Sequence, residues 1–335
     1  MCAARPRVPL GHAHEIRQGA PGCNRRDQPL MRQSLAYHTL DVFTETRFAG
    51  NPLAVVHGAD ALSGAQMQAV AREFNLSETV FVLRPERPAH SARVRIFTPA
   101  VELPFAGHPT VGTAALLAEL RQGETTSEQE AIVVLEEAIG TVRVGVRLKP
   151  GVAAFAEFDA PKLPEETGGL PAPERLAAAL GLIPSEIGFA NYKPLAASAG
   201  TAFAFVPVAT LAAMARARPM QPQFEQIFSG PVPPGAFLYC RETLHTTSSF
   251  HARMFAPAMG MAEDPATGSA AAAFAAVIRK FDTPPDGMHR WVIEQGFEMG
   301  RPSLIALSML VGRGKLEAVR IGGHAVRVSA GTIEV

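Results

Sequence analysis

Two titratable side chains, His108 and Asp264, occupy equivalent places in two similar stretches of the chain, each directly before a proline. An enzyme that moves a proton needs one group to remove it and another to return it, and such groups can stand on opposite walls of a cleft. Taken alone, either residue also fits a helix cap, since Asp is among the best N-caps. Because the two residues coincide at matched positions, we predict a catalytic role for both.

A third candidate, Glu78, stands at the start of an apolar, β-branched segment that is typical of a buried strand. A carboxyl group held there would be partly desolvated, and desolvation raises its pKa toward neutral pH. The spacing alone also fits an ordinary exposed glutamate in a loop. Glu78 is therefore a candidate acid or base whose role depends on its burial.

The stretches around His108 and Asp264 form an internal repeat. The pattern Arg-x-Phe-x-Pro-Ala at residues 95–100 recurs at 253–258, and the stretch 109–115, which runs from proline into Gly-Thr-Ala-Ala, recurs at 265–271 with Gly-Ser-Ala-Ala. Each copy continues into an alanine-rich run that is apolar on all sides, which predicts a helix buried inside its lobe. We therefore expect two lobes of one design, each built around a central helix.

The starts of the two repeated helices, near residues 107–112 and 264–268, predict a site for a small anion. The first backbone N–H groups of a helix have no partner within the helix and carry partial positive charge. Two such ends that face each other across a cleft would hold the carboxylate of a small substrate. The loop at 107–113 lacks the lysine of a phosphate-binding GxxxxGK[ST] loop, and the chain contains no GxGxxG or GxSxG motif. Nucleotide-dependent redox chemistry and serine-hydrolase chemistry therefore lack their usual sequence support.

The composition narrows the partners and the setting. The 335 residues include 31 Lys+Arg and 31 Asp+Glu, so we expect no broad face that binds nucleic acid. Three cysteines without a CxxC pair favour neither a disulfide framework nor a thiolate zinc site, which predicts a cytoplasmic protein without a bound metal. No apolar run is long enough to span a bilayer, so no membrane partner is expected.

The patterning divides the chain into four parts. Residues 1–33 are rich in arginine, proline and glycine and lack apolar periodicity, which predicts a disordered or mis-started extension. A first lobe is expected over 34–155 and a second over 156–324. The final strand, 325–335, is expected to pair back onto the first lobe.

Apolar runs and helical spacing predict the individual elements. Strands are expected at 35–43, 79–84, 92–97, 131–136, 141–148, 203–208, 236–241, 248–255, 291–297, 304–311 and 316–321. Helices are expected at 66–74, capped by Ser63, and at 175–182. The proline, glycine and acidic residues of 159–174 predict a linker between the lobes.

Five ordered motifs in the chain resemble those of the PhzF family, the phenazine-biosynthesis-like isomerases. They lie at residues 50–52, 76–81, 97–99, 107–114 and 263–270, and the resemblance runs from about Ala36 to Val335. It implies the diaminopimelate-epimerase-like fold, an α+β fold of two pseudo-symmetric lobes in which a β-barrel-like sheet surrounds a central helix. It also implies a cofactor-free biosynthetic isomerase, often a homodimer, of which the best-known member moves a proton along a dihydro-hydroxyanthranilate ring. For this chain we expect a small carboxylated metabolite as the substrate.

The same resemblance implies roles for single residues. Glu78 matches the family's acid/base glutamate, which takes a proton from one substrate carbon and delivers it to another. His108 and Asp264 match the polar pair that orients the substrate and assists the transfer. Backbone and hydroxyl contacts to the substrate are implied for Gly107, Gly268 and Ser269.

One position departs from the family pattern, and two other functions remain open. Ala271 stands where relatives commonly have a histidine, which points to a different ligand. An epimerase or racemase would use His108 and Asp264 as opposed bases and invert one carbon. A relative without catalysis would bind a small anion in the same cleft.

Overall fold

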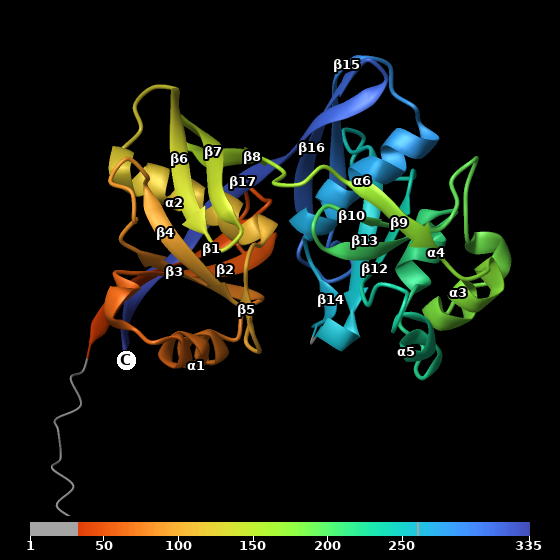
Figure 1. Ribbon diagram of the computed structural model, residues 1–335, viewed down its shortest axis with the longest axis horizontal. Helices are drawn as coiled ribbons and strands as arrows, with labels where there is room; N and C mark the ends of the chain where they lie inside the picture. The colour runs from red at the N-terminus through yellow and green to blue at the C-terminus, as the bar shows by residue number, and fades with distance from the viewer. Residues whose placement is uncertain (1–32, 260) are drawn as a thin grey trace, which may run out of the picture. The chain divides into compact units, whose positions relative to one another are not determined.

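The computed structural model describes residues 33–259 and 261–335, of which 34–335 form one compact unit (Figure 1). The first half of this unit contains β1 (Ser34–Val42), β2 (Asn51–His57), η1 (Ala59–Ala61), α1 (Gly64–Phe74), β3 (Glu78–Leu83), β4 (Ala92–Phe97), β5 (Glu102–Leu103), α2 (Gly107–Gln122), β6 (Gln129–Glu137), β7 (Gly140–Lys149) and β8 (Val152–Asp159). The second half contains β9 (Glu165–Gly169), α3 (Pro173–Leu180), η2 (Pro184–Glu186), β10 (Leu195–Ser198), β11 (Ala202–Pro207), α4 (Leu211–Arg216), α5 (Gln223–Ile227), β12 (Ala236–Cys240), β13 (Phe250–Ala256), η3 (Pro257–Met259), β14 (Met261–Asp264), α6 (Gly268–Phe281), β15 (Gly287–Gln295), β16 (Ser303–Gly312) and β17 (Lys315–Glu334).

The strands of the first half close into a barrel. Hydrogen bonding runs around a ring in the order β1, β2, β3, β4, β6, β7, β8 and β17, and β17 pairs back onto β1. Closure leaves no free edge in this sheet. Helix α2 packs against β6, β7, β8 and β17 and is surrounded by the barrel.

The second half repeats this pattern around α6. Its strands follow the order β9, β10, β11, β12, β13, β15, β16 and β17. Parallel pairs occur at matched places, β2 with β3 and β4 with β6 in one half, β11 with β12 and β13 with β15 in the other. The α+β fold expected from the repeat is therefore confirmed, with both central helices in one apolar core.

Strand β17 serves both halves. Its first part pairs with β16 and its last part, Ala325 to Glu334, pairs with β1. The residue numbers given above for the lobe boundaries stay a prediction. The prediction of a disordered or mis-started extension falls on residues 1–32, which lie outside the described part of the chain, and on Gln33.

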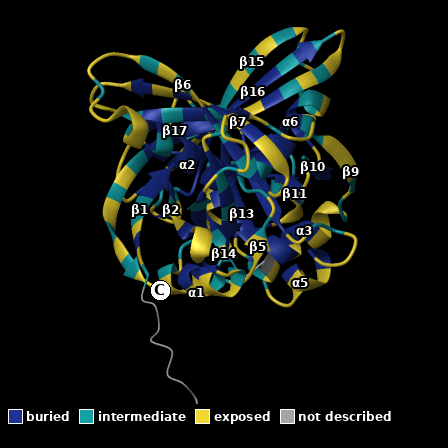
Figure 2. Ribbon diagram, turned by 60° about the vertical axis from the view of Figure 1, so that its left-hand side comes forward, coloured by how far each residue is buried: buried dark blue, intermediate teal, exposed yellow. Residues whose placement is uncertain are grey.

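Small residues allow α2 to sit inside its barrel. Most of its residues are buried, and Figure 2 shows the helix mainly in the colour for buried residues. In β6, more buried residues alternate with less buried ones. A Cβ atom on Gly112 would lie 2.7 Å from side-chain atoms of both Leu53 and Val42. Glycine at this position therefore lets the helix approach β1 and β2 closely.

Most predicted elements are present, with ends that shift by a few residues. Ser63 caps α1 as expected, because its side chain accepts a hydrogen bond from the backbone N–H of Gln66, and the side-chain oxygen of Gln66 accepts one from the backbone N–H of Ser63. No apolar pattern predicted β2, β5, β8, β9, β10, β14, α4 or α5. Strand β9 lies inside the stretch 159–174 that was expected to be only a linker. This short strand, which has the sequence Glu-Glu-Thr-Gly-Gly and no apolar pattern, exists because β10 supplies hydrogen-bond partners.

Two observations on the described residues concern membranes and metals. No helix in this part of the chain is long and apolar enough to cross a membrane. Within the same residues, no group of His, Cys, Asp and Glu side chains is arranged to hold a metal ion.

Candidate active site

Glu78 is the first residue of β3, and its carboxyl group is buried. The strand lies parallel to β2, where Glu78 is opposite Leu53, and β3 is apolar after its first two residues. Burial raises the pKa of Glu78 well above its usual value, and the nearby charge of Asp264 raises it further. The reading of Glu78 as an exposed loop residue is therefore wrong, and its surroundings favour the protonated form of its carboxyl group.

His108 lies in the first turn of α2, directly beside Glu78. Its Nε2 atom is 3.3 Å from Oε2 of Glu78, and neither atom has a hydrogen-bond partner among the described residues. The imidazole also donates to the backbone carbonyl of Pro52. Burial lowers the pKa of His108 to about 3 despite that bond, so the ring is neutral. A neutral imidazole and a carboxyl group whose pKa is raised thus face each other, each with an unused polar atom.

Asp264 ends β14, and both of its carboxylate oxygens accept hydrogen bonds. Asn51 donates to Oδ1 at 2.9 Å, and the Thr267 hydroxyl donates to Oδ2 at 2.6 Å. Burial raises the pKa of Asp264 to about 6, and these hydrogen bonds oppose the rise by stabilising the charged form. Asp264 is therefore mainly ionised at neutral pH, and its negative charge adds to the effect of burial in raising the pKa of Glu78.

A second layer of amide groups holds Asp264 in place. Asn51, which belongs to β2, also donates to the carbonyl of Ala266, so it ties the first half of the protein to the second. Gln295 donates to the backbone carbonyl of Asp264 and accepts from the backbone N–H of Thr267. Sequence patterns predicted no role for the side chains of Asn51, Thr267 and Gln295, although they stand in the triplets Gly-Asn-Pro, Pro-Ala-Thr and Glu-Gln-Gly.

The first turns of α2 and α6 touch each other at their glycines. A Cβ atom on Gly107 would lie 3.2 Å from the Cα atom of Gly268, and one on Gly268 would lie 3.4 Å from Cα of Gly107. The N-cap residues are Ala106 and Thr267, and neither helix start receives a hydrogen bond from a side-chain cap. Neither His108 nor Asp264 is an N-cap, so the capping explanation for these two residues is wrong. Two adjacent sets of backbone N–H groups remain for an anion.

The matched positions of the repeat do not have identical settings. His108 is inside α2, whereas Asp264 precedes α6 by four residues and ends a strand. Ser269, the second residue of α6, is partly exposed, and Ala271 is fully buried. The structure thus brings Glu78 beside His108 and Gly107 beside Gly268, with Asp264 close enough to affect Glu78. The catalytic and binding roles of these residues stay predictions.

A cavity of about 450 Å³ adjoins this cluster. Its wall includes Pro52, whose carbonyl accepts a hydrogen bond from His108. The wall also includes Ser77, which precedes Glu78, and Pro265, which follows Asp264. Glu78, His108 and Asp264 themselves do not line it. Most of the wall is apolar, and its two charged residues, Glu263 and Arg301, are already paired with Arg253 and Asp41. The cavity suits a small molecule whose body is largely apolar.

Comparisons with known proteins identify relatives of this chain. The family model described as phenazine biosynthesis-like protein, PhzC-PhzF, matches residues 40–331. The chain is 52% identical to an uncharacterized isomerase from Mesorhizobium japonicum, over 90% of this chain and 99% of that protein. It is 34% identical to the trans-2,3-dihydro-3-hydroxyanthranilate isomerase of Pseudomonas aeruginosa, over 88% and 98% of the two chains. A solved structure of a PhzF-family protein from Bacillus anthracis matches with a TM-score of 0.79 and 25% identity, over 90% of this chain and 99% of that one.

Proposed function

Because the chain belongs to the phenazine biosynthesis-like family of isomerases, PhzC-PhzF, we propose that it shifts a proton on a small carboxylated metabolite without a cofactor. Glu78 is the acid/base in this proposal. In its ionised form it takes a proton from one substrate carbon, and the resulting acid returns that proton to another carbon. The electron pair left by the broken C–H bond moves through the substrate to the new position, so no oxidant or reductant is needed.

The observation that carries the proposal is the buried contact between Glu78 and His108. An acid/base works best when its pKa lies near the operating pH, and burial beside Asp264 moves Glu78 in that direction. His108 offers a neutral nitrogen 3.3 Å from Oε2 of Glu78, close enough to orient the carboxyl group. Buried polar atoms without partners are uncommon, so these two support a substrate that completes their hydrogen bonding.

The paired helix starts support the carboxylated substrate. Negative charge that develops during proton removal spreads into an adjacent carboxylate, and backbone N–H groups at Gly107, Gly268 and Ser269 would stabilise it there. Fixed backbone dipoles need little reorganisation, which is the physical advantage of such a site. A homodimer in the cytoplasm remains part of the proposal, as an expectation from the family resemblance.

The substrate of the Pseudomonas aeruginosa relative is the first compound to test. We expect incubation of the protein with trans-2,3-dihydro-3-hydroxyanthranilate or smaller unsaturated carboxylates in heavy water to place solvent deuterium at a new carbon, detected by NMR. Inversion at one carbon without movement of unsaturation would instead support the epimerase with opposed bases. Tight binding of these compounds without any deuterium exchange would support the anion binder. The low pKa of His108 makes that residue a weak base and so disfavours the epimerase.

We expect Gly107→Ala to weaken substrate binding while the protein remains folded. The added Cβ would press on the backbone of Gly268, which has no flexible side chain to move, so the two helix starts must separate by a few tenths of an ångström. Small misplacements of a binding group are costly, and we expect KM to rise about tenfold. Steady-state kinetics would measure this. Gly168→Ala is the matched control, since a Cβ there meets open space, and an equal KM in both variants would contradict the role of the helix starts.

A further inference from the structure

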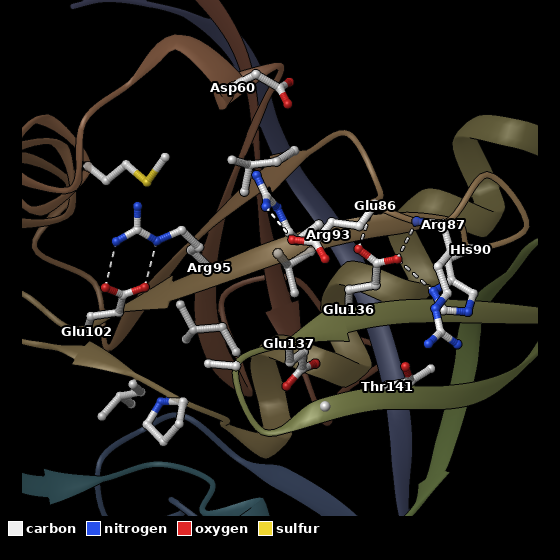
Figure 3. A pocket seen from close by; sticks show the side chains of 18 of the residues that line it. Asp60, Glu86, Arg87, His90, Arg93, Arg95, Glu102, Glu136, Glu137 and Thr141 are labelled. Atoms are coloured by element: carbon white, nitrogen blue, oxygen red, sulfur yellow. Dashed lines mark hydrogen bonds and ion pairs between the residues drawn. The ribbon is translucent and has the colours of Figure 1, made fainter.

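A cavity of about 590 Å³ lies on the first half of the protein (Figure 3), and it shares no lining residue with the cavity beside Ser77 and Pro265. Its wall carries three ion pairs, Arg93 with Glu86, Arg95 with Glu102 and His90 with Glu136. Glu137 differs from the other acids of the wall because its carboxyl group is buried and has no ionic partner among the described residues. Figure 3 shows Glu136 bonded to His90, whereas no contact joins Glu137 to the residues drawn.

The contacts of Glu137 lead toward α2 rather than into the cavity. Glu137 is the last residue of β6, and its Oε1 atom lies 2.8 Å from the hydroxyl oxygen of Thr110 in the first turn of α2. The same hydroxyl lies 2.8 Å from the backbone carbonyl of Ala106, the N-cap of that helix. Thr110 is therefore bonded to an oxygen atom on each side.

The number of available protons indicates which of the three oxygen atoms, in Glu137, Thr110 and Ala106, carry a hydrogen. A threonine hydroxyl has one proton to donate and a carbonyl oxygen has none, so Thr110 can serve both neighbours only by sharing that proton, which gives two weakened bonds. Two full hydrogen bonds form at these 2.8 Å distances when Glu137 carries a proton and donates it to Thr110, which then donates to Ala106. Burial independently raises the pKa of Glu137 to about 8, which keeps the carboxyl group protonated at neutral pH.

We propose that Glu137 is a positioning residue which, as a neutral acid, holds Thr110 against the carbonyl of Ala106 and so fixes the first turn of α2. That turn carries Gly107 and His108 between the two bonded residues. Ionisation of Glu137 would remove the donated proton and leave two acceptors competing for one hydroxyl. The effect on activity rests on the proposed function, whereas the protonation of Glu137 does not.

The surrounding charges do not account for the state of Glu137. The charged or titratable groups that share the cavity wall with it are Arg93 and Arg95 from β4, Glu102 from β5, Glu136 from β6, and Asp60, Glu86, Arg87 and His90 from the segments before β4. Most of these groups are paired with one another, and none of them contributes to the pKa shift, which has burial as its main cause. The raised pKa of Glu137 is thus a consequence of its burial and not of the charges on the cavity wall.

The test compares Glu137→Gln with the natural protein across pH. The glutamine amide still donates to Thr110 but cannot ionise, so the hydrogen bonds that link residue 137, Thr110 and the carbonyl of Ala106 should persist at high pH. We expect similar kcat/KM values for the two proteins near pH 6.5 and about tenfold higher kcat/KM for the variant at pH 9, where most Glu137 carboxyl groups would be ionised. Glu130→Gln, which changes an exposed acid on the same strand, should follow the natural protein at every pH.

A second readout does not need a substrate. A carboxyl group with a raised pKa stabilises the folded state below its unfolded pKa of about 4.3 and loses that contribution as pH rises through the folded value. The melting temperature of Glu137→Gln should therefore gain on that of the natural protein from pH 5 to about pH 8 and then level off. A difference in melting temperature that stays constant with pH would contradict the proposal that Glu137 is protonated. A pH-dependent difference in melting temperature with no difference in kcat/KM would overturn its positioning role, and absence of exchange in every protein would instead count against the proposed function.

Discussion

Glu78→Gln is expected to abolish deuterium incorporation, with kcat at least about 10³-fold lower, because removal of a general acid/base costs roughly 10²–10⁴-fold. An amide has nearly the shape of the protonated carboxyl group and can still donate toward His108, so the site should keep its geometry. The amide cannot take a proton from carbon, however. Solvent exchange and product formation should therefore disappear together.

Stability gives the internal control for this variant. The pKa of Glu78 is raised on folding, so the natural protein loses stability as pH rises above the unfolded value of about 4.3, whereas glutamine does not titrate. We expect the melting temperature of Glu78→Gln at pH 7 to equal or exceed that of the natural protein. Exchange at the natural rate in a folded variant would show that another group carries the proton. Glu130→Gln again serves as the exposed control on the same half.

Asp264→Asn is expected to have the second largest effect, because it removes the negative charge that keeps a proton on Glu78. Loss of that charge lowers the pKa of Glu78, so the rise of kcat/KM with pH should move to lower pH. The ionised Glu78 would also be a weaker base, and we expect kcat to fall about 10²-fold, the usual cost of losing one electrostatic group in a site. Measurement of kcat/KM from pH 5 to 9 would test both effects.

Thr267→Val distinguishes charge from position in that experiment. It removes the 2.6 Å hydrogen bond to Oδ2 but leaves the carboxylate and the bond from Asn51. One hydrogen bond that stabilises the charged form is lost, so the pKa of Asp264 should rise further above about 6 and its negative charge at neutral pH should decrease. If the charge of Asp264 sets the pKa of Glu78, the profile of Thr267→Val should shift to lower pH by less than that of Asp264→Asn. A profile that does not shift, with a loss of kcat equal to that of Asp264→Asn, would contradict the role of the charge.

The sequence by itself determined the local elements and the repeat. A continuous apolar run defines β6, and alternating apolar positions define β7. The serine and glutamine at the start of α1 form its cap. These preferences depend on residues that are close in the chain. The alanine-rich runs after Gly112 and Gly268 have no polar face, so they had to lie inside the protein. The motifs also pointed to Glu78, His108 and Asp264 as candidates.

Only the tertiary structure decided which protons these residues hold. The pKa of a carboxyl group depends on burial and on charges that packing brings near, and the distance between Glu78 and His108 follows from the position of α2 inside its barrel. Asn51 reaches Asp264 from 213 residues away in the chain. Glu137 and Thr110 are 27 residues apart in the chain and form a hydrogen bond, and no local sequence pattern predicts that contact. Sequence patterns report how a segment interacts with its own neighbours, whereas proton positions depend on distances that exist only after the barrel has closed.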